Sequence, residues 1–347
     1  MNKKILLSIA AVILLLISVP YFKGTKPNEL TIGALLPLSG PASVWGENIR
    51  NGMELALQDK QSIKIIYEDS KGTPADGVSA FHALKQKGSD ILVSALSAVS
   101  VPVSKVALEE KTPLLATLTA ADNIVNDYAT RIYSSSANFA EPAFTASSSP
   151  VISATKIAVI YRNDELGNSV FRHIQELSTS NNKEIVYSAS FKPNETDFTT
   201  VVTKVRATGA EVLIFVPVTP GEALGIVKIV NQLGLNIPLV ESSTVLASMS
   251  SRSELGNTNI YFNAYNFSVP GNSEEFKSAY KQKYNTNPNF AGAFGYDVVN
   301  TIYACKDKKT DIEKCIRETN NLNGVAGTAV QVAPGDFNIP LHLEKVN

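Results

Sequence analysis

The 347-residue chain contains few residues of the kinds that bind metals or carry out redox chemistry. It has two cysteines, Cys305 and Cys315, and three histidines, His82, His173 and His342. These five residues are scattered, whereas zinc sites and catalytic metal sites place their ligands at short, regular spacings. We therefore expect neither a metal site nor a cofactor.

An excess of charge of one sign is also missing. The chain has 31 Lys and Arg residues against 32 Asp and Glu residues, a formal net charge of −1, and it contains no basic tract. Proteins that bind nucleic acids use clustered Lys and Arg side chains to neutralise phosphates. Nucleic acid is therefore not an expected partner.

A long apolar run occurs only near the N-terminus. Lys3 and Lys4 precede an apolar run from Ile5 to Val19, which Pro20 follows. This order is typical of export signals, so residues 1–24 are predicted to be a signal peptide or an uncleaved membrane anchor. The run lacks a clear small-x-small cleavage site, and the roughly 18 residues from Ile5 through Phe22 are at the short end for crossing a bilayer. In both cases the rest of the chain is predicted to be extracytoplasmic, in the periplasm or at the cell surface.

Export changes the interpretation of the two cysteines. Cys305 and Cys315 lie ten residues apart, and disulfides persist in oxidising compartments. We predict a structural disulfide between them, the alternative being two free thiols.

After Gly24 the chain alternates between short apolar segments with strand character and amphipathic segments of helical length. This order predicts parallel sheets covered by helices, because each crossover must return the chain to the same edge. The pattern restarts after the Ser-rich stretch 147–150, which predicts a second α/β lobe. The expected strands are Leu30–Leu36, Ile63–Tyr67, Ile91–Val93 and Pro113–Leu115 in the first lobe, and Lys156–Tyr161, Glu184–Ser190, Val212–Val216 and Pro238–Val240 in the second.

The lobe boundaries follow from this pattern. Residues 29–137 are assigned to the first lobe, completed by about 266–324, and residues 138–265 to the second, completed by about 325–347. The chain therefore crosses between lobes more than once. Gly324–Val332 and Ile339–Val346 are expected to form a closing hairpin.

The loops after the first-lobe strands are rich in hydroxyl groups, and ligands of open parallel sheets bind at such strand ends. Ser97, Thr117 and Thr119 are the candidate ligand-binding residues there, with helix capping as their alternative role. No His or Cys lies in these loops to activate a serine, which favours binding over catalysis. Trp45, the single tryptophan, is predicted either to form a pocket wall or to pack between lobes.

The loops of the second lobe add Asp164, Thr219, Glu241 and Ser243 as candidates. A carboxylate facing the first-lobe hydroxyls could pair with a ligand ammonium. Glu241 is the first choice for this role and Asp164 the second; the alternative is that each is a solvated loop acid.

Several segments together resemble a known family. The opening Ile32–Pro41, the pair Trp45-Gly46 and the segment Asn51–Ala56 are similar to the start of type I periplasmic binding proteins of the branched-chain amino acid (Leu/Ile/Val) group. Later segments with the same likeness are Lys156–Tyr161 with Asn163-Asp164 and Gly167, Thr196–Phe198, Gly234-Leu235, Ala293–Asp297 and Gly335-Asp336.

The resemblance implies an α/β fold of two lobes, each a mostly parallel sheet flanked by helices, joined by a multi-strand hinge. It also implies a receptor that closes on a small, amino acid-like ligand and delivers it to the membrane permease of an ABC transporter. Ser97 matches a family residue that holds the ligand carboxylate. Ala98, Leu166 and Ser243 depart from the family pattern, which puts the ligand's identity in doubt.

Two functions remain open at this point. The first is an extracytoplasmic solute-binding receptor of an importer. The second is the ligand-sensing ectodomain of a signalling or regulatory system, since the same fold serves both. An enzyme is not expected, because the chain has no nucleophile-elbow motif and no phosphate-binding loop.

Overall fold

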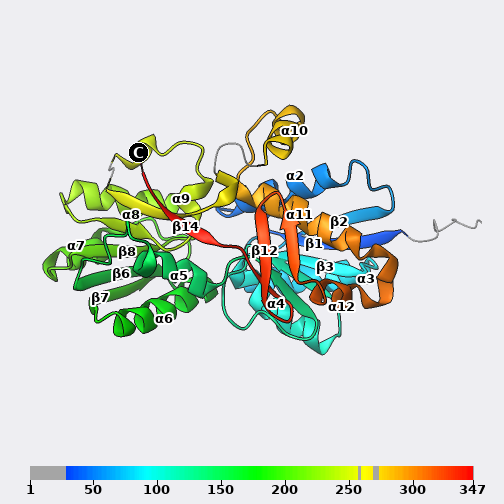
Figure 1. Ribbon diagram of the computed structural model, residues 1–347, viewed down its shortest axis with the longest axis horizontal. Helices are drawn as coiled ribbons and strands as arrows, with labels where there is room; N and C mark the ends of the chain where they lie inside the picture. The colour runs from blue at the N-terminus through cyan, green and yellow to red at the C-terminus, as the bar shows by residue number, and fades with distance from the viewer. Residues whose placement is uncertain (1–28, 257–258, 269–272, 347) are drawn as a thin grey trace, which may run out of the picture.

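The computed structural model describes residues 29–256, 259–268 and 273–346. These residues form two α/β lobes that lie side by side along the long axis of the molecule (Figure 1). The predicted signal peptide or anchor, residues 1–24, lies outside the described residues. Within the described part of the chain, no helix combines the length and apolar character needed to cross a membrane.

The first lobe is built on an eight-stranded sheet in the order β11-β12-β13-β5-β4-β3-β1-β2. Its central strands pair in parallel, with Ile32 of β1 opposite Ile65 of β2 on one side and Ile91 of β3 on the other. The strands are β1 (Leu30–Leu36), β2 (Ile63–Asp69), β3 (Ile91–Ala95), β4 (Leu114–Thr117), β5 (Ala129–Ile132), β11 (Asn321–Gly324), β12 (Gly327–Ala333) and β13 (Asp336–Asn338).

Helices cover this sheet, and two of them pack unusually closely. A Cβ atom at Gly52 of α2 would lie 1.9 Å from the carbonyl oxygen of Gly292 in α11, so only glycine lets the two backbones approach this far. The first-lobe helices are α2 (Ser43–Ala56), α3 (Pro74–Gln86), α4 (Ser97–Glu109), α10 (Glu274–Tyr284), α11 (Phe290–Ala304) and α12 (Ile312–Arg317), with the 3₁₀ turn η3 (Lys306–Asp311).

The second lobe is built on a six-stranded sheet in the order β14-β10-β9-β8-β6-β7. All of its pairs are parallel except that of β10 with β14. Its strands are β6 (Lys156–Arg162), β7 (Glu184–Phe191), β8 (Val212–Val216), β9 (Leu239–Glu241), β10 (Ile260–Tyr265) and β14 (Leu341–Lys345). Its helices are α5 (Ser136–Thr145), α6 (Glu165–Ser180), α7 (Thr199–Ala207), α8 (Pro220–Gln232) and α9 (Val245–Ser248), with η1 (Ser253–Leu255) and η2 (Asn266–Ser268).

The chain passes between the sheets three times: after β5, after β10 and after β13. These connections are the hinge. The prediction of a two-lobed α/β fold with mostly parallel sheets is confirmed.

The structure corrects the expected path of the last segment. β12 and β13 belong to the first sheet, because Phe337 is buried there and Asp336 pairs with Arg131 of β5 at 2.7 Å. Only β14 joins the second sheet. The expected hairpin between Gly324–Val332 and Ile339–Val346 is therefore wrong, and the antiparallel partner of β12 on its other side is β11.

Cys305 and Cys315 form the predicted disulfide, which links the end of α11 to α12. We expect that replacing both with Ser lowers the free energy of unfolding by about 2–3 kcal/mol, because a loop of this length loses that much closure entropy when cross-linked. Urea unfolding of the variant and of the native protein measures the difference. An equal loss on adding reductant to the native protein supports this cause, and an unchanged midpoint contradicts it.

Candidate functional site

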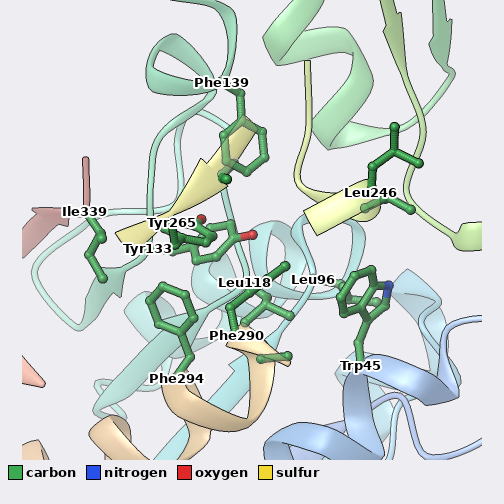
Figure 2. Packing of buried hydrophobic residues seen from close by; sticks show 14 of the residues in the cluster. Trp45, Leu96, Leu118, Tyr133, Phe139, Leu246, Tyr265, Phe290, Phe294 and Ile339 are labelled. Atoms are coloured by element: carbon green, nitrogen blue, oxygen red, sulfur yellow. The ribbon is translucent and has the colours of Figure 1, made fainter. Parts of the chain in front are cut away.

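A small cavity lies where the two lobes meet. Its volume is about 30 Å³, room for about one water molecule. Trp45, Leu96, Leu118 and Phe290 line it from the first lobe, and Leu166 and Ser243 from the second. In Figure 2 the side chains of Trp45, Leu96, Leu118 and Phe290 gather at one place, beneath Leu246 of the second lobe. A ligand larger than water needs more room than this cavity offers in the present arrangement of the lobes.

Trp45 joins the two lobes at the cavity. It lies in the first turn of α2 and is 4% exposed. Its indole Nε1 donates to the carbonyl oxygen of Val218, which follows β8 of the second lobe, at 3.0 Å. Its ring centroid is 5.7 Å from that of Phe290 in α11. Trp45 thus lines the cavity and packs between the lobes, and its contact with a ligand stays a prediction.

Leu96 and Leu118 line the cavity from strained backbone positions. Each follows the carboxyl end of a strand, β3 or β4, and their φ angles are +72° and +47°. Leucine rarely adopts such a conformation, which costs on the order of 1–3 kcal/mol and is characteristic of functional sites. This backbone conformation directs both side chains into the wall of the cavity between the lobes.

Ser97 begins α4, between Leu96 of the cavity and Ala98, which lines a neighbouring groove. Its Oγ accepts hydrogen bonds from the backbone N–H groups of Ala120 and Ala121, both at 3.1 Å. Both lone pairs of the hydroxyl are then occupied, so the side chain has only its proton to offer to another group.

Thr117 and Thr119 are fully buried and bond within the first lobe. Thr119 Oγ1 donates to Ser100 Oγ at 2.8 Å or to the carbonyl oxygen of Thr117 at 2.9 Å. Thr117 Oγ1 makes a long contact of 3.5 Å with the carbonyl oxygen of Ile132. Neither threonine is among the residues that line the cavity or the groove.

The groove next to the cavity is larger and more polar. Its volume is about 340 Å³, within the range of small-molecule sites. The first lobe contributes Lys71 and Thr73 to its walls, and the second contributes Arg162, Asp164 and Thr219. It therefore also opens between the lobes.

Arg162 is the centre of a buried ion cluster at this groove. Its Nε lies 2.9 Å from Asp164 Oδ2, and its Nη1 lies 3.2 Å from Glu222 Oε1. Asp164 also caps α6 by accepting the N–H of Gly167, and burial raises the pKa of its carboxyl. Thr219 and Glu222 form a capping box at α8. Asp164 and Thr219 are thus helix caps that border the groove.

Glu241 and Ser243 form a second buried cluster. Ser243 donates to the Glu241 carboxylate, which also accepts the N–H groups of Val245 at 2.8 Å and of Leu246 at 3.1 Å at the start of α9. Glu241 is completely buried and is not among the residues that line the cavity or the groove. Burial raises its pKa to about 7, although these hydrogen bonds oppose the rise.

The raised pKa of Glu241 predicts a pH dependence of stability. The folded chain holds this proton more tightly than the unfolded chain, whose ordinary value is 4.5, so the free energy of unfolding should fall as pH rises from about 4.5 to 7. This difference in the pKa of Glu241 between the folded and unfolded chain corresponds to about 3 kcal/mol in the free energy of unfolding. Unfolding midpoints of the native protein and of Glu241→Gln, measured from pH 5 to pH 8, test it. The variant should show a shallower fall, and parallel curves would refute this origin.

Asp122 forms a contact between the lobes, two residues after Ala120 of the cavity wall. It lies in the first lobe after β4, and its carboxylate pairs with Arg172 and, at 3.3 Å, with His173 of α6. It also accepts the hydroxyl of Ser136 at 2.5 Å, and its N–H donates to Ser169 Oγ at 3.2 Å. These bonds hold α6 against the first lobe.

A larger hollow, of about 570 Å³, lies outside the cleft. It is bounded by α11 and by β11 and β12, all in the first lobe. Asp297, the one acid among the described residues of its wall, accepts the N–H groups of Val325 and Ala326, both at 2.8 Å. None of the described residues that line the hollow belongs to the second lobe, so the candidate site is the cleft.

The arrangement of two lobes, a hinge and an interlobe cavity agrees with the sequence comparison. A family model described as "Periplasmic binding protein" matches residues 29–333. The chain belongs to the periplasmic binding protein family. This periplasmic binding protein is similar to the Leu/Ile/Val-binding protein homolog 3 of Brucella melitensis, with 26% identity over 206 residues. That match spans 56% of this chain and 56% of the relative, so it covers little more than half the length of either.

Solved structures show the same fold. The branched-chain amino acid transporter substrate-binding protein LivJ of Streptococcus pneumoniae, in complex with isoleucine, superposes with a TM-score of 0.77 at 19% identity, covering 91% of this chain and 99% of that one. An ABC transporter solute-binding protein of R. palustris, in complex with 4-hydroxybenzoate, gives a TM-score of 0.81 at 17% identity, covering 92% and 93%. The type I fold, expected from the resemblance, is thereby confirmed.

The sequence analysis missed several residues that the structure places at the cleft. Arg162 had a signal: it is the charged end of an otherwise apolar strand, directly before Asn163-Asp164. Tyr133 and Phe139 had none, because they follow β5, whose four residues are too short to give a strand pattern. Tyr133 Oη lies 3.1 Å from Thr244 Oγ1 of the second lobe.

Proposed function

We propose that this protein is the solute receptor of an ABC importer, and that its lobes close on a small carboxylate, an amino acid or a related acid. The observation that supports this most directly is the cavity between the lobes, where Trp45 of one lobe bonds Val218 of the other. A ligand held there contacts both lobes. It therefore stabilises the closed form, by no more than its difference in affinity for the two states.

The membrane permease then recognises the closed shape. The two lobes present their outer faces in one fixed relation only when the hinge is shut. The ligand is released when the permease favours the open form. No bond of the ligand is made or broken, so it leaves unchanged. The family consists of solute-binding proteins, and the proposal needs no chemical step at the cleft.

A ligand panel tests this proposal. The exported protein is purified and its melting midpoint is measured with amino acids and small carboxylates, while small-angle scattering follows the radius of gyration. A ligand at 100 times its Kd should add about 2.7 kcal/mol to the free energy of unfolding, and the same ligand should reduce the radius. If no member of the panel raises the midpoint, the proposed ligand class is wrong.

A further inference from the structure

The cavity and the groove are two parts of one cleft. Leu166 lines the cavity, and Glu165, directly before it in the chain, lines the groove. Val218 and Thr219 are divided between the two spaces in the same way. A molecule held between the lobes can therefore extend from the cavity, whose described lining is uncharged and mainly apolar, into a polar groove of about 340 Å³.

Arg162 has an unused hydrogen-bond donor in the wall of this groove. Its side chain is only 9% exposed, with Nε against Asp164 and Nη1 against Glu222. The third nitrogen, Nη2, has no hydrogen-bond partner among the described residues. It is not enclosed either, because the buried side-chain atoms that lack a partner include Nε but not Nη2. Since Arg162 lines the groove, the N–H groups of Nη2 are available to a molecule there.

The second lobe holds this guanidinium in position by itself. Asp164 accepts the N–H of Gly167 at 2.9 Å. Glu222 accepts the N–H of Val218 at 2.8 Å. Because both acids and their partners belong to the second lobe, the position of Arg162 does not depend on how far apart the lobes are. A donor that is fixed before binding loses little conformational freedom when a ligand arrives.

The charges around Nη2 favour an uncharged acceptor. Asp164 and Glu222 place two carboxylates beside one guanidinium. Glu165 and Lys71, both exposed, add one charge of each sign to the groove wall. One negative charge is therefore in excess, and it would repel a ligand carboxylate at Nη2. A carbonyl oxygen meets no such repulsion, and its hydrogen bond from a charged donor is stronger than one between neutral groups.

We infer that the ligand, within the function proposed above, carries an uncharged amide that lies in the groove and accepts a hydrogen bond from Arg162 Nη2. Its apolar part occupies the cavity beside Trp45. The ligand is thus an apolar amino acid or related acid lengthened by a peptide unit. The inference narrows the proposed class and rests on it.

Matched ligands test this inference on the native protein. Titration calorimetry compares leucine with glycyl-leucine and leucyl-glycine, and phenylalanine with the corresponding dipeptides. Each dipeptide keeps one ammonium and one carboxylate and adds one uncharged amide. We expect at least one dipeptide to bind about ten times more tightly than its amino acid, or more. Asparaginyl-leucine should also bind more tightly than aspartyl-leucine, which brings a further negative charge.

Three variants locate the amide. Ala98→Phe fills the groove from the first lobe, whereas Ala207→Phe adds the same side chain to the exposed end of α7, outside the cleft. The preference for the dipeptide should fall to about twofold or less in Ala98→Phe and stay unchanged in Ala207→Phe. Arg162→Lys keeps the positive charge and removes Nη2, so the preference should fall there too. Circular dichroism checks that each variant folds, and Ala98→Phe leaves the ion cluster untouched if Arg162→Lys does not.

The outcomes separate this inference from the proposed function. If an amino acid binds as tightly as its dipeptides, or if aspartyl-leucine binds more tightly than asparaginyl-leucine, the inference is overturned while the receptor function stands. A dipeptide preference that survives in folded Ala98→Phe or Arg162→Lys would place the amide elsewhere and also overturn it. If neither these ligands nor the wider panel above binds, the inference and the proposed function both fail.

Discussion

Replacing Trp45 with Ala is expected to weaken ligand binding about 100-fold or more, the loss typical of a central aromatic residue at a buried interface. The indole supplies both the hydrogen bond to Val218 and the ring contact with Phe290. Its removal therefore takes from the closed form the bond to Val218, which the open form does not have, and it also removes a pocket wall that packs on Phe290 within the first lobe. Titration calorimetry with the tightest ligand of the panel measures the loss.

Trp45→Phe is the matched control. It keeps a ring against Phe290 and removes only the N–H that reaches Val218, so its loss should be about tenfold or less. Because Trp45 is the single tryptophan, its fluorescence in the native protein reports closure without a label. Unchanged affinity in a folded Trp45→Ala variant would show that the ligand binds elsewhere.

Replacing Arg162 with Met is expected to lower the free energy of unfolding by about 3–5 kcal/mol, the usual cost of leaving buried charges without their partner. The side chains of Arg162, Asp164 and Glu222 are at most 9% exposed. Without the guanidinium, the two carboxylates repel each other in a medium that cannot solvate them. Urea unfolding at pH 7 measures the cost.

The pH dependence of Arg162→Met separates charge from packing. As pH falls, the unpaired carboxylates take up protons, so the cost should shrink; a cost caused by lost packing would stay constant. The variant Arg162→Met with Asp164→Asn and Glu222→Gln should recover much of the stability at pH 7. A loss in the single variant below about 1 kcal/mol would contradict a structural ion cluster.

The fold was predictable where the periodicity is strong. β1 and β8 were predicted to the residue, because each is an apolar run with a glutamate directly before it and a proline directly after it. β13 was not predicted: its three residues carry no pattern, and what places it is the pairing of Asp336 with Arg131, 205 residues away. A contact between residues so far apart in the sequence leaves no local pattern from which the strand could be predicted.

For the candidate site, too, the sequence indicated part of the answer: the positions of the loops, but not the partners of their side chains. The loops that carry Trp45, Ser97 and Ser243 were identified because they follow strand ends, where topology directs ligands. What each side chain does there depends on its partners. From the sequence alone, the Glu241 carboxylate could face a ligand. In the structure it accepts the N–H groups of Val245 and Leu246 at the start of α9 instead.

Because the chain passes between the lobes three times, neither sheet can complete its strand pairing until late in synthesis. During synthesis β5 leaves the ribosome long before β13, yet the β11–β12 hairpin joins the first sheet only through β13. β14, which follows β13 in the chain, forms the edge of the other sheet beside β10. Truncation before residue 336 would thus leave two unfinished edges, each open to aggregation. Residues 336–345 therefore complete the strand pairing of both sheets.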